Sequence, residues 1–226
     1  MKISIWPLLA ASCVRFTERE LKPYVSVIGQ LSLAWNALYE QLAAIFHVLL
    51  DRGIRKLDEY GMEDDVDERP IKLWNSAKFD RPKRELLRAV IETVTDEERA
   101  FFPKLVDDLT WLLQRADSLE DARNDAVHSP LLYIGATKAM REAFGIIIMP
   151  NLLYGNPRSA KLAKKGLLNE FRWCRDTVLA LRDFANLISG SLALGTALLL
   201  WPDRPFLPNR GEKKASRRAQ SRPVRK

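Results

Sequence analysis

Apolar residues recur every three or four positions along most of this chain, which is the spacing of one face of an α-helix. The clearest run lies between residues 24 and 51, where Glu40 is the only charged residue between Lys22 and Asp51. We therefore predict a core helix here, with an unbroken apolar stripe facing the interior. The stripe consists of Leu31, Trp35, Leu38, Leu42, Ile45 and Leu49.

The side of this helix opposite the stripe carries three polar residues. At about 100° per residue, Asn36, Glu40 and His47 fall on one side, and the residues that flank them are mostly apolar. Burying a carboxylate without a partner costs several kcal/mol, so we expect Glu40 to have a cationic partner. We interpret His47 as a hydrogen-bonded core residue, with a role as a second active-site histidine as the alternative.

Further helical segments follow, and capping residues mark their ends. The periodicity predicts a helix over about 81–93. Thr95 and Glu98 form a capping-box signature, which predicts the start of a third helix. Pro103 is expected to kink or restart that helix.

A second capping signature precedes the most informative part of the chain. Ser118 and Asp121 repeat the capping pattern, which predicts a short helix over about 119–128. Ser129 precedes Pro130 and is therefore pushed out of the helical region, so the helix should end there.

Beyond residue 130 the periodicity is less regular, because glycine and proline interrupt short apolar runs. We interpret this part as an insertion, followed by a basic amphipathic stretch from Ser159 and a long closing helix over about 166–200. We find no strand-turn-strand pattern and no internal repeat, so the predicted class is all-α. One domain is expected over residues 1–208, with its core in 24–130 and the closing helix. The interrupting residues are Gly135, Gly145, Pro150, Gly155 and Pro157.

The formal charge of +7 belongs to the end of the chain. Residues 209–226 hold eight basic residues and one acid, and removing them from the totals of 36 and 29 leaves 28 against 28 in residues 1–208. We predict that 209–226 is a disordered basic tail, which attracts RNA by counterion release or serves only as a solvated tail. Weak candidates for RNA contacts are Lys161, Lys164, Lys165, Arg217 and Arg218.

The remaining composition argues against several kinds of chemistry. Cys13 and Cys174 lie far apart and match no metal or redox spacing, which favours two ordinary thiols in a reducing, cytoplasmic compartment. No glycine-rich phosphate loop is present, so a nucleotide cofactor is not expected. The seven acids within residues 58–68 are interpreted as a solvated connection. We therefore predict neither a cofactor nor a metal site.

Two segments resemble membrane or export signals. Residues 3–14 form a short apolar run after Lys2, but Pro7 interrupts it, so we favour a chain that is not exported. Residues 184–202 carry no charge and precede the basic tail, as in a membrane span with positive residues inside. Several polar residues and a charged lead-in favour a buried closing helix instead, and a tail-anchored membrane protein remains the alternative.

The candidate chemistry lies in the segment 123–128, which reads Arg-Asn-Asp-Ala-Val-His. Arginine holds phosphate with a planar fork of donors, and histidine transfers protons near neutral pH. This combination suits phosphodiester cleavage, with Arg123 and His128 as the catalytic residues. Asn124 is expected to orient the phosphate, and Glu40 to hold Arg123 in place. The non-catalytic interpretation is that Arg123 pairs with Glu40 or Asp121, and that His128 caps a helix end.

On these residues the chain resembles the HEPN superfamily (higher eukaryotes and prokaryotes nucleotide-binding), in which many nucleases carry Arg, four to six residues, then His. Arg123, Asn124 and His128 match that motif, and residues 34–40 resemble the glutamate-bearing helix of several bacterial branches. The resemblance covers roughly residues 24–130. It implies an antiparallel helical bundle and metal-independent RNA cleavage in toxin-antitoxin or antiviral defence, with an antitoxin protein as a further partner.

One position departs from the family pattern. The toxin branch that is controlled by nucleotide addition has Tyr two residues after the histidine, and this chain has Pro130 there. Control by modification of such a tyrosine is therefore not expected.

The chemistry also predicts an oligomeric state. Attack by an RNA 2′-hydroxyl needs a base, the leaving 5′-oxygen needs an acid, and the phosphorane needs positive charge. One histidine cannot be protonated and deprotonated at once, so a two-fold homodimer that brings two copies of His128 together is expected. The alternative function is a non-catalytic HEPN-like module that binds RNA or protein.

Overall fold

The structure is a computed structural model of the whole chain. It describes residues 18–54, 69–129, 131–134, 147–151, 157–163, 165–194 and 201–210. The predicted export segment 3–14, the acidic segment 58–68, Cys13, Pro130, Lys164, Arg217 and Arg218 lie outside the described residues.

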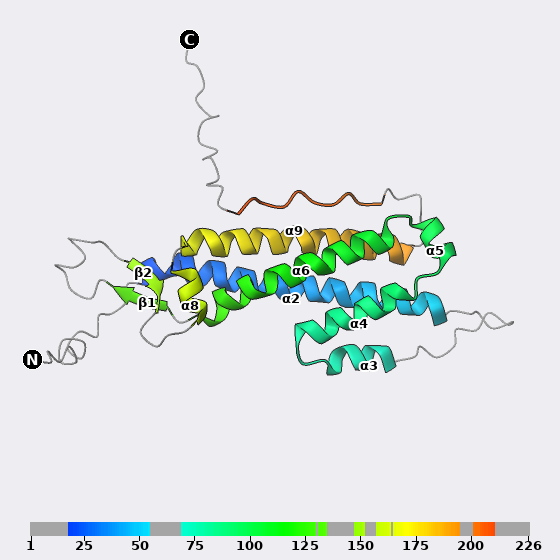
Figure 1. Cartoon of the computed structure of the whole chain (residues 1–226), viewed down its shortest axis with the longest axis horizontal. Helices are drawn as coiled ribbons and strands as arrows, with labels where there is room; N and C mark the ends of the chain where they lie inside the picture. Colours follow the sequence, from blue (N-terminus) through cyan, green and yellow to red (C-terminus); the bar gives the residue numbers. More distant parts are fainter. Residues whose placement is uncertain are drawn as a thin grey trace, which may run out of the picture.

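Most of the described residues are helical, which confirms the predicted helical class. Four helices form the bundle: α2 (Glu18–Ile54), α4 (Asp80–Glu92), α6 (Leu105–His128) and α9 (Leu167–Leu194). Figure 1 shows α2 and α9 running in the same direction, with α6 antiparallel to both. Three shorter helices complete the described set: α3 (Arg69–Ser76), α5 (Asp96–Phe101) and α8 (Pro157–Leu162).

The core lies between the three long helices, and α2 packs along α9 over the longest interface. All six residues of the predicted stripe on α2 are buried. Helix α9 contributes Phe171, Phe184, Ile188 and Leu192 to the same core, so the closing helix is a core element, as favoured from the sequence. Its described part ends at Leu194, and residues 195–200 lie outside the described residues.

The predicted helix over 81–93 corresponds to α4, and the predicted capping box opens α5. The Thr95 side chain accepts from the Glu98 backbone, and the Glu98 side chain accepts from the Thr95 backbone. The helix that follows does not continue through Pro103, because α5 ends at Phe101 and α6 begins at Leu105. The proline therefore marks a restart, which was one of the two expectations.

The predicted start of the motif helix at residue 119 is wrong. Helix α6 runs without interruption from Leu105 to His128, so Ser118 lies in its interior. The Ser118 Oγ donates to the carbonyl of Arg115 at 2.8 Å, which satisfies the hydroxyl within the helix instead of capping a new one. The predicted end is correct, because Ser129 has extended backbone angles (φ −75°, ψ 126°) before Pro130.

The interpretation of the segment after residue 130 as free of strands is also wrong. Strand β1 (Leu131–Ile134) pairs antiparallel with β2 (Ile147–Pro150), with Leu131 opposite Pro150. Each strand is only four residues long, and each is apolar without a polar alternation. A period of two could therefore not be recognised in the sequence.

The segment 201–210 returns along the bundle in an extended conformation, and we call it the strap. Figure 1 shows it running along α9 back toward the first turn of that helix. Trp201 and Leu207 pack against the core, and Arg210, assigned to the tail from the sequence, forms an ion pair with Glu170. Residues 209 and 210, which the sequence assigns to the tail, therefore belong to the described part of the chain.

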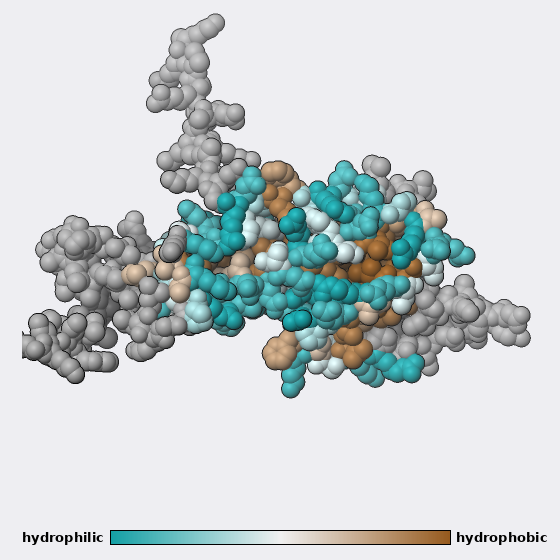
Figure 2. Space-filling model, viewed as in Figure 1, coloured by the Kyte–Doolittle hydropathy of each residue, from teal (hydrophilic) through white to brown (hydrophobic). Residues whose placement is uncertain are grey.

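Two segments, Leu21–Leu50 and Leu167–Leu194, are long and apolar enough to cross a membrane by length and composition. Core helices of soluble proteins meet the same criterion, and both segments carry core residues on their inner faces. Much of the bundle surface in Figure 2 is hydrophilic, while apolar residues show at the edge formed by α3. Leu73 and Phe79 are large exposed apolar residues at that edge.

Candidate functional site

The Arg/His motif occupies the last two turns of α6. At about 100° per residue, Arg123 and His128 lie about 140° apart around the helix, so they do not share a face. Asn124 lies one turn before His128 and therefore faces the same way. The Nη1 of Arg123 donates to the Asn124 Oδ1 at 2.8 Å, so the guanidinium is drawn toward the side of the helix that bears the histidine.

Arg123 is held by an aromatic ring of α2. Its guanidinium carbon lies 5.8 Å from the centroid of the Trp35 ring, which is the geometry of a cation–π contact. The indole is fixed in turn, because its Nε1 donates to the Asp80 Oδ2 at 2.8 Å. The Nε of Arg123 is buried without a hydrogen-bond partner. Arg123 is thus oriented by stacking and by one neutral acceptor, and no carboxylate of the described residues neutralises it.

The expected partnership between Glu40 and Arg123 is absent from the described structure. Glu40 is exposed and forms no ion pair with Arg123, so the expectation that it needs a cationic partner was wrong. The physical reason is that its side of α2 faces solvent, with Asn36 and Leu33 also exposed. Asp121, the other partner considered for Arg123, lies 3.8 Å from the Nζ of Lys161 instead.

His128 is the last residue of α6, and its side chain is exposed. A histidine at the end of a helix can donate to the free carbonyls of the last turn, so the capping interpretation also fits its position. The same position leaves the imidazole accessible to a ligand that contacts Asn124. His47, the alternative second histidine, lies on α2, where its ring contacts Phe46.

A buried polar network lies next to Trp35 and was missed from the sequence. The guanidinium of Arg84 is 1% exposed and bonds the Tyr39 hydroxyl, Asp117 and Glu120. Tyr39 lies against Trp35, with the ring centroids 5.5 Å apart. The network therefore links α2, α4 and α6 next to Trp35, whose ring contacts Arg123.

Burial and charge shift the pKa values in this network. Desolvation raises the pKa of the Tyr39 hydroxyl well above its ordinary value and outweighs the opposing effect of Arg84. Desolvation acts to lower the pKa of Arg84, but the Tyr39 and Glu120 partners outweigh it and the pKa is raised. Both groups therefore keep their protons at neutral pH, and Arg84 remains a fixed cation.

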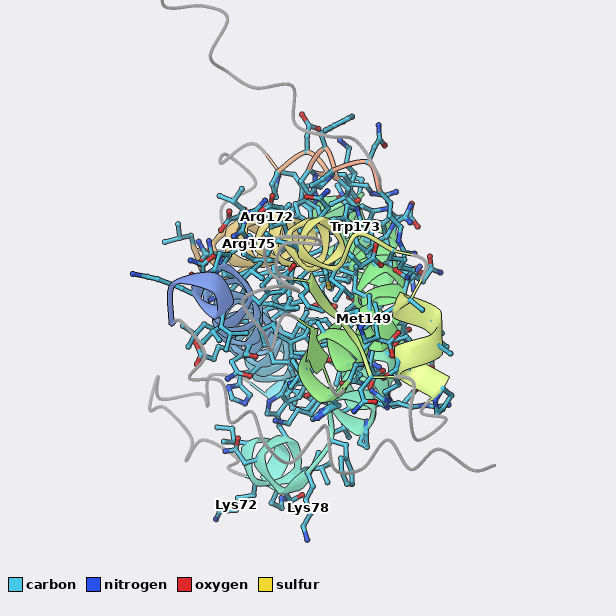
Figure 3. The ribbon with its side chains drawn as sticks, turned by 90° about the vertical axis from the view of Figure 1, so that its left-hand side faces the viewer. Lys72, Lys78, Met149, Arg172, Trp173 and Arg175 are labelled. Atoms are coloured by element: carbon cyan, nitrogen blue, oxygen red, sulfur yellow. The ribbon has the colours of Figure 1, made fainter. Side chains whose placement is uncertain are left out.

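The lysines proposed as weak RNA contacts differ in their surroundings. Lys165 Nζ lies 3.0 Å from a Glu170 oxygen, so its charge is largely compensated within the body. Lys161 is exposed beside Asp121. Arg172, which was not singled out, is exposed and makes no hydrogen bond or ion pair in the described structure. Figure 3 looks at this end of the bundle and shows Arg172 and Arg175 together on one side of α9, with Trp173 on the other side.

Cys174 is a free, buried thiol near the motif. Burial, assisted by the charge of Glu170, raises its pKa to about 12, so it stays protonated at neutral pH. Among the described residues, no three His, Cys, Asp or Glu side chains are grouped so that they could hold a metal ion.

Comparisons with protein-family models, curated proteins and solved structures give no match. The similarity to HEPN proteins therefore rests on the motif residues themselves.

Proposed function

We propose that this chain is a metal-independent endoribonuclease of the HEPN type, in which Arg123 and His128 carry the reaction. The observation that supports it most directly is the hydrogen bond from Arg123 to Asn124, one helical turn before the exposed His128. This contact brings Arg123, which has no carboxylate partner among the described residues, and an accessible histidine to one end of α6. Cleavage of a phosphodiester requires a positive charge and a proton-transfer group close to the same phosphate.

In the proposed reaction the 2′-hydroxyl attacks the adjacent phosphorus and the 5′-oxygen leaves. Arg123 stabilises the negative charge that develops on the phosphorane, and the Trp35 ring keeps its guanidinium in place. His128 transfers a proton, either from the attacking hydroxyl or to the leaving oxygen. The products are a 2′,3′-cyclic phosphate and a free 5′-hydroxyl.

The second proton transfer requires a second group. We propose that a two-fold homodimer supplies the other His128, because each chain has one histidine at this end of the bundle. The resemblance further suggests a cytoplasmic role in toxin-antitoxin or antiviral defence, with an antitoxin as a protein partner. Pro130 stands where a modifiable tyrosine would be needed, so such a partner would have to act by binding.

The decisive experiment is cleavage of total RNA by the purified chain in EDTA, with analysis of the fragment ends. We expect 2′,3′-cyclic phosphates from the wild type and a loss of at least about 100-fold for His128→Ala and Arg123→Ala, the scale of general acid–base and electrostatic contributions. Arg115→Ala is the matched control, because Arg115 also lies on α6 and over a tryptophan ring, Trp111, at 5.7 Å.

The outcome separates the two functions that the sequence leaves open. Equal activity of wild type, His128→Ala and Arg123→Ala would refute the catalytic assignment. If RNA is bound but not cut, and Arg123→Ala weakens binding while Arg115→Ala does not, the non-catalytic RNA-binding module is correct instead.

A further inference from the structure

An exposed aromatic ring stands at the start of α4. Phe79 is 73% exposed and makes no ring contact with another side chain of the described residues. Its backbone is extended (φ −123°, ψ 157°), and its side chain makes no capping hydrogen bond to the helix. Neither packing nor capping therefore accounts for a phenylalanine here. An isolated exposed apolar residue is ordinary on a protein surface, so its neighbours decide whether it has a role.

Cations flank this ring on both sides. Lys78 precedes it and is exposed, with no hydrogen bond or ion pair in the part of the chain that the structure describes. The Arg81 side chain is 80% exposed, and its contact with Glu85 is as long as 4.0 Å. Figure 3 shows Lys78 extending away from the bundle beside α3. Residues 78–83 hold three basic residues and one acid, so this turn is positively charged.

The same turn adjoins the Arg/His motif. Its one acid, Asp80, accepts from the Trp35 Nε1 at 2.8 Å, and the Trp35 ring in turn lies 5.8 Å from the guanidinium carbon of Arg123. Trp35 itself is 1% exposed, so its ring is not available to a ligand. Phe79 offers an accessible ring one residue away from the carboxylate that holds Trp35. A phosphate held by Arg123 would therefore have nearby nucleotides of its strand at the start of α4.

We propose that Phe79, Lys78 and Arg81 form a subsite for an unpaired nucleotide near the phosphate held by Arg123, an inference that rests on the proposed function. The ring stacks on a base, and the two cations contact the phosphates on either side of it. Such stacking tolerates any base sequence, because every base has a flat face. In a duplex these faces are already covered by neighbouring bases, so the subsite selects unpaired RNA.

The surface suits RNA better than an anionic membrane. A helix that lies on a membrane inserts a continuous apolar face. Over the described residues 69–92, the large exposed apolar side chains are only Leu73 and Phe79, and they lie on separate elements. The contacts that connect Phe79 to Arg123 through Asp80 and Trp35 have no role in membrane binding.

The first test measures binding of a short unpaired RNA with 2′-O-methyl groups, which prevent 2′-hydroxyl attack. Phe79→Ala should bind it at least about fivefold more weakly, the lower end for the loss of one base–aromatic stack. Phe79→Trp keeps a flat ring and should bind at least as tightly as the wild type. Phe79→Leu keeps apolar area without a ring and should bind like Phe79→Ala.

The control is Phe206→Ala, because Phe206 is 86% exposed on the strap, which Figure 1 shows on the opposite edge of the bundle from α3. It should bind like the wild type. A duplex RNA should bind the wild type and Phe79→Ala alike. Equal binding of the unpaired RNA by the wild type and Phe79→Ala would overturn the subsite, and full affinity of Phe79→Leu would overturn the stacking.

The second test addresses the cations. Lys78→Gln combined with Arg81→Gln removes two phosphate contacts, so the salt dependence of binding should fall by up to about 1.4 logarithmic units per decade of salt. Lys104→Gln is the control, because Lys104 is an exposed lysine at the other end of α6. An unchanged salt dependence of the double variant would show that these cations do not contact the strand, which contradicts the proposal.

The subsite and the proposed function fail separately, because binding is measured on RNA that cannot be cleaved. If the Phe79 variants bind in the expected order but cleavage does not depend on His128, the catalytic assignment alone is refuted. If cleavage depends on His128 but Phe79→Ala binds and cleaves like the wild type, the subsite alone is refuted. If Phe79→Ala keeps its RNA affinity and loses binding to vesicles containing phosphatidylserine, the turn serves an anionic membrane and the inference is wrong.

Discussion

Arg84 is a charged residue that the fold buries almost completely. Its guanidinium is fully buried between three helices and is matched by a hydroxyl and two carboxylates. Removing one partner of such a group leaves the others without compensation, which costs more than the pair itself contributes. The residue therefore links the motif helix α6 to Trp35 through Tyr39.

We expect Arg84→Met to lower the free energy of unfolding by about 3 kcal/mol, because the Tyr39 hydroxyl and the carboxylates lose their cation. The carboxylates are partly exposed and can be hydrated, which limits the loss. Urea unfolding followed by circular dichroism measures it. Arg88→Met is the control, since Arg88 is only partly buried and its pairing with Asp117 should contribute less than about 1 kcal/mol. Equal losses for both variants would contradict the importance of burial.

Asn124 is expected to act through Arg123. Replacing it with alanine removes the acceptor that draws the guanidinium toward His128, so the cleavage rate should fall by up to about 100-fold. The loss should appear in kcat more than in KM, because the phosphate contact itself is kept. Gln114→Ala, an exposed position on the same helix, is the control. Unchanged kinetics of Asn124→Ala would show that this hydrogen bond does not position the arginine.

At this scale the sequence predicted local relationships and missed distant ones. Arg123, Asn124 and His128 are close in the chain, so their spacing alone indicates a common helix end. The Arg84 network joins residues that are 33 to 45 positions apart. The helical spacing does align Arg84 with the buried Leu87 and Ile91, but it does not indicate which distant partners would compensate its charge. Glu40 was expected to have a cationic partner because its side of α2 was assumed to be buried. That side is exposed, so the carboxylate needs no partner.

The elements differ in how their ends are specified. Thr95 opens α5 with a reciprocal capping box, whereas Lys104 opens α6 without any side-chain cap. The sequence therefore indicated the first boundary, and Pro103 marked a restart as the second, but the Ser118 signature wrongly suggested a further helix start inside α6. The Ser118 hydroxyl donates to a carbonyl within α6. Whether such a serine caps a helix or lies inside one depends on the packing of α6 along α9. The strap was missed because its three prolines resemble a linker, while its anchors lie on α6 and α9.

We expect Thr95→Ala to destabilise the chain by about 1 kcal/mol, since it leaves the backbone amide of Glu98 without its acceptor. Thr93→Ala is a close control, because Thr93 is exposed and its hydroxyl bonds only a carbonyl that water can reach. That variant should stay within about 0.5 kcal/mol of wild type. Thermal and urea unfolding give both values, and a control that loses as much as Thr95→Ala would argue against the capping box.

The strap anchor should depend on pH. Burial acts to raise the pKa of Glu170, but hydrogen bonds from Arg210 and Lys165 outweigh it and the pKa is lowered. A lowered pKa means that the folded chain binds fewer protons than the unfolded chain, so the carboxylate's contribution is present at neutral pH and is lost on acidification. We therefore expect Glu170→Gln to cost about 1 kcal/mol at pH 7, because Arg210 is half exposed.

The difference between wild type and Glu170→Gln should shrink as the pH falls below the ordinary carboxyl value of 4.5. Urea unfolding at pH 7, 5 and 3.5 tests this. Asp203→Asn is the control, because Asp203 belongs to the same strap but is almost fully exposed beside Lys104. A difference that grows toward low pH would show that Glu170 is not stabilised by its cations.

For the whole molecule, the helical bundle buries the inner faces of the two most apolar helices, α2 and α9. The inner faces of α2 and α9 supply much of the core, and Trp201 of the strap adds an aromatic contact with Phe102 at the end of α5. The helical class and most core residues follow from periodicity, because burial of one helix face has a direct sequence signature. The course of the strap does not, because it is set by contacts of single residues with α6 and α9.

The proposed chemistry requires that the whole molecule be a homodimer. We expect a particle of twice the 25.9 kDa of one chain by light scattering, because each chain offers one His128 and the reaction needs two. Mixing wild type with an equal amount of His128→Ala and allowing subunits to exchange should lower the activity per wild-type chain to about one half, since only wild-type homodimers keep both histidines. Mixing with Arg115→Ala should leave it unchanged. A fully active monomer, or activity that is insensitive to mixing, would show that a single His128 suffices and that another group of the same chain performs the second proton transfer.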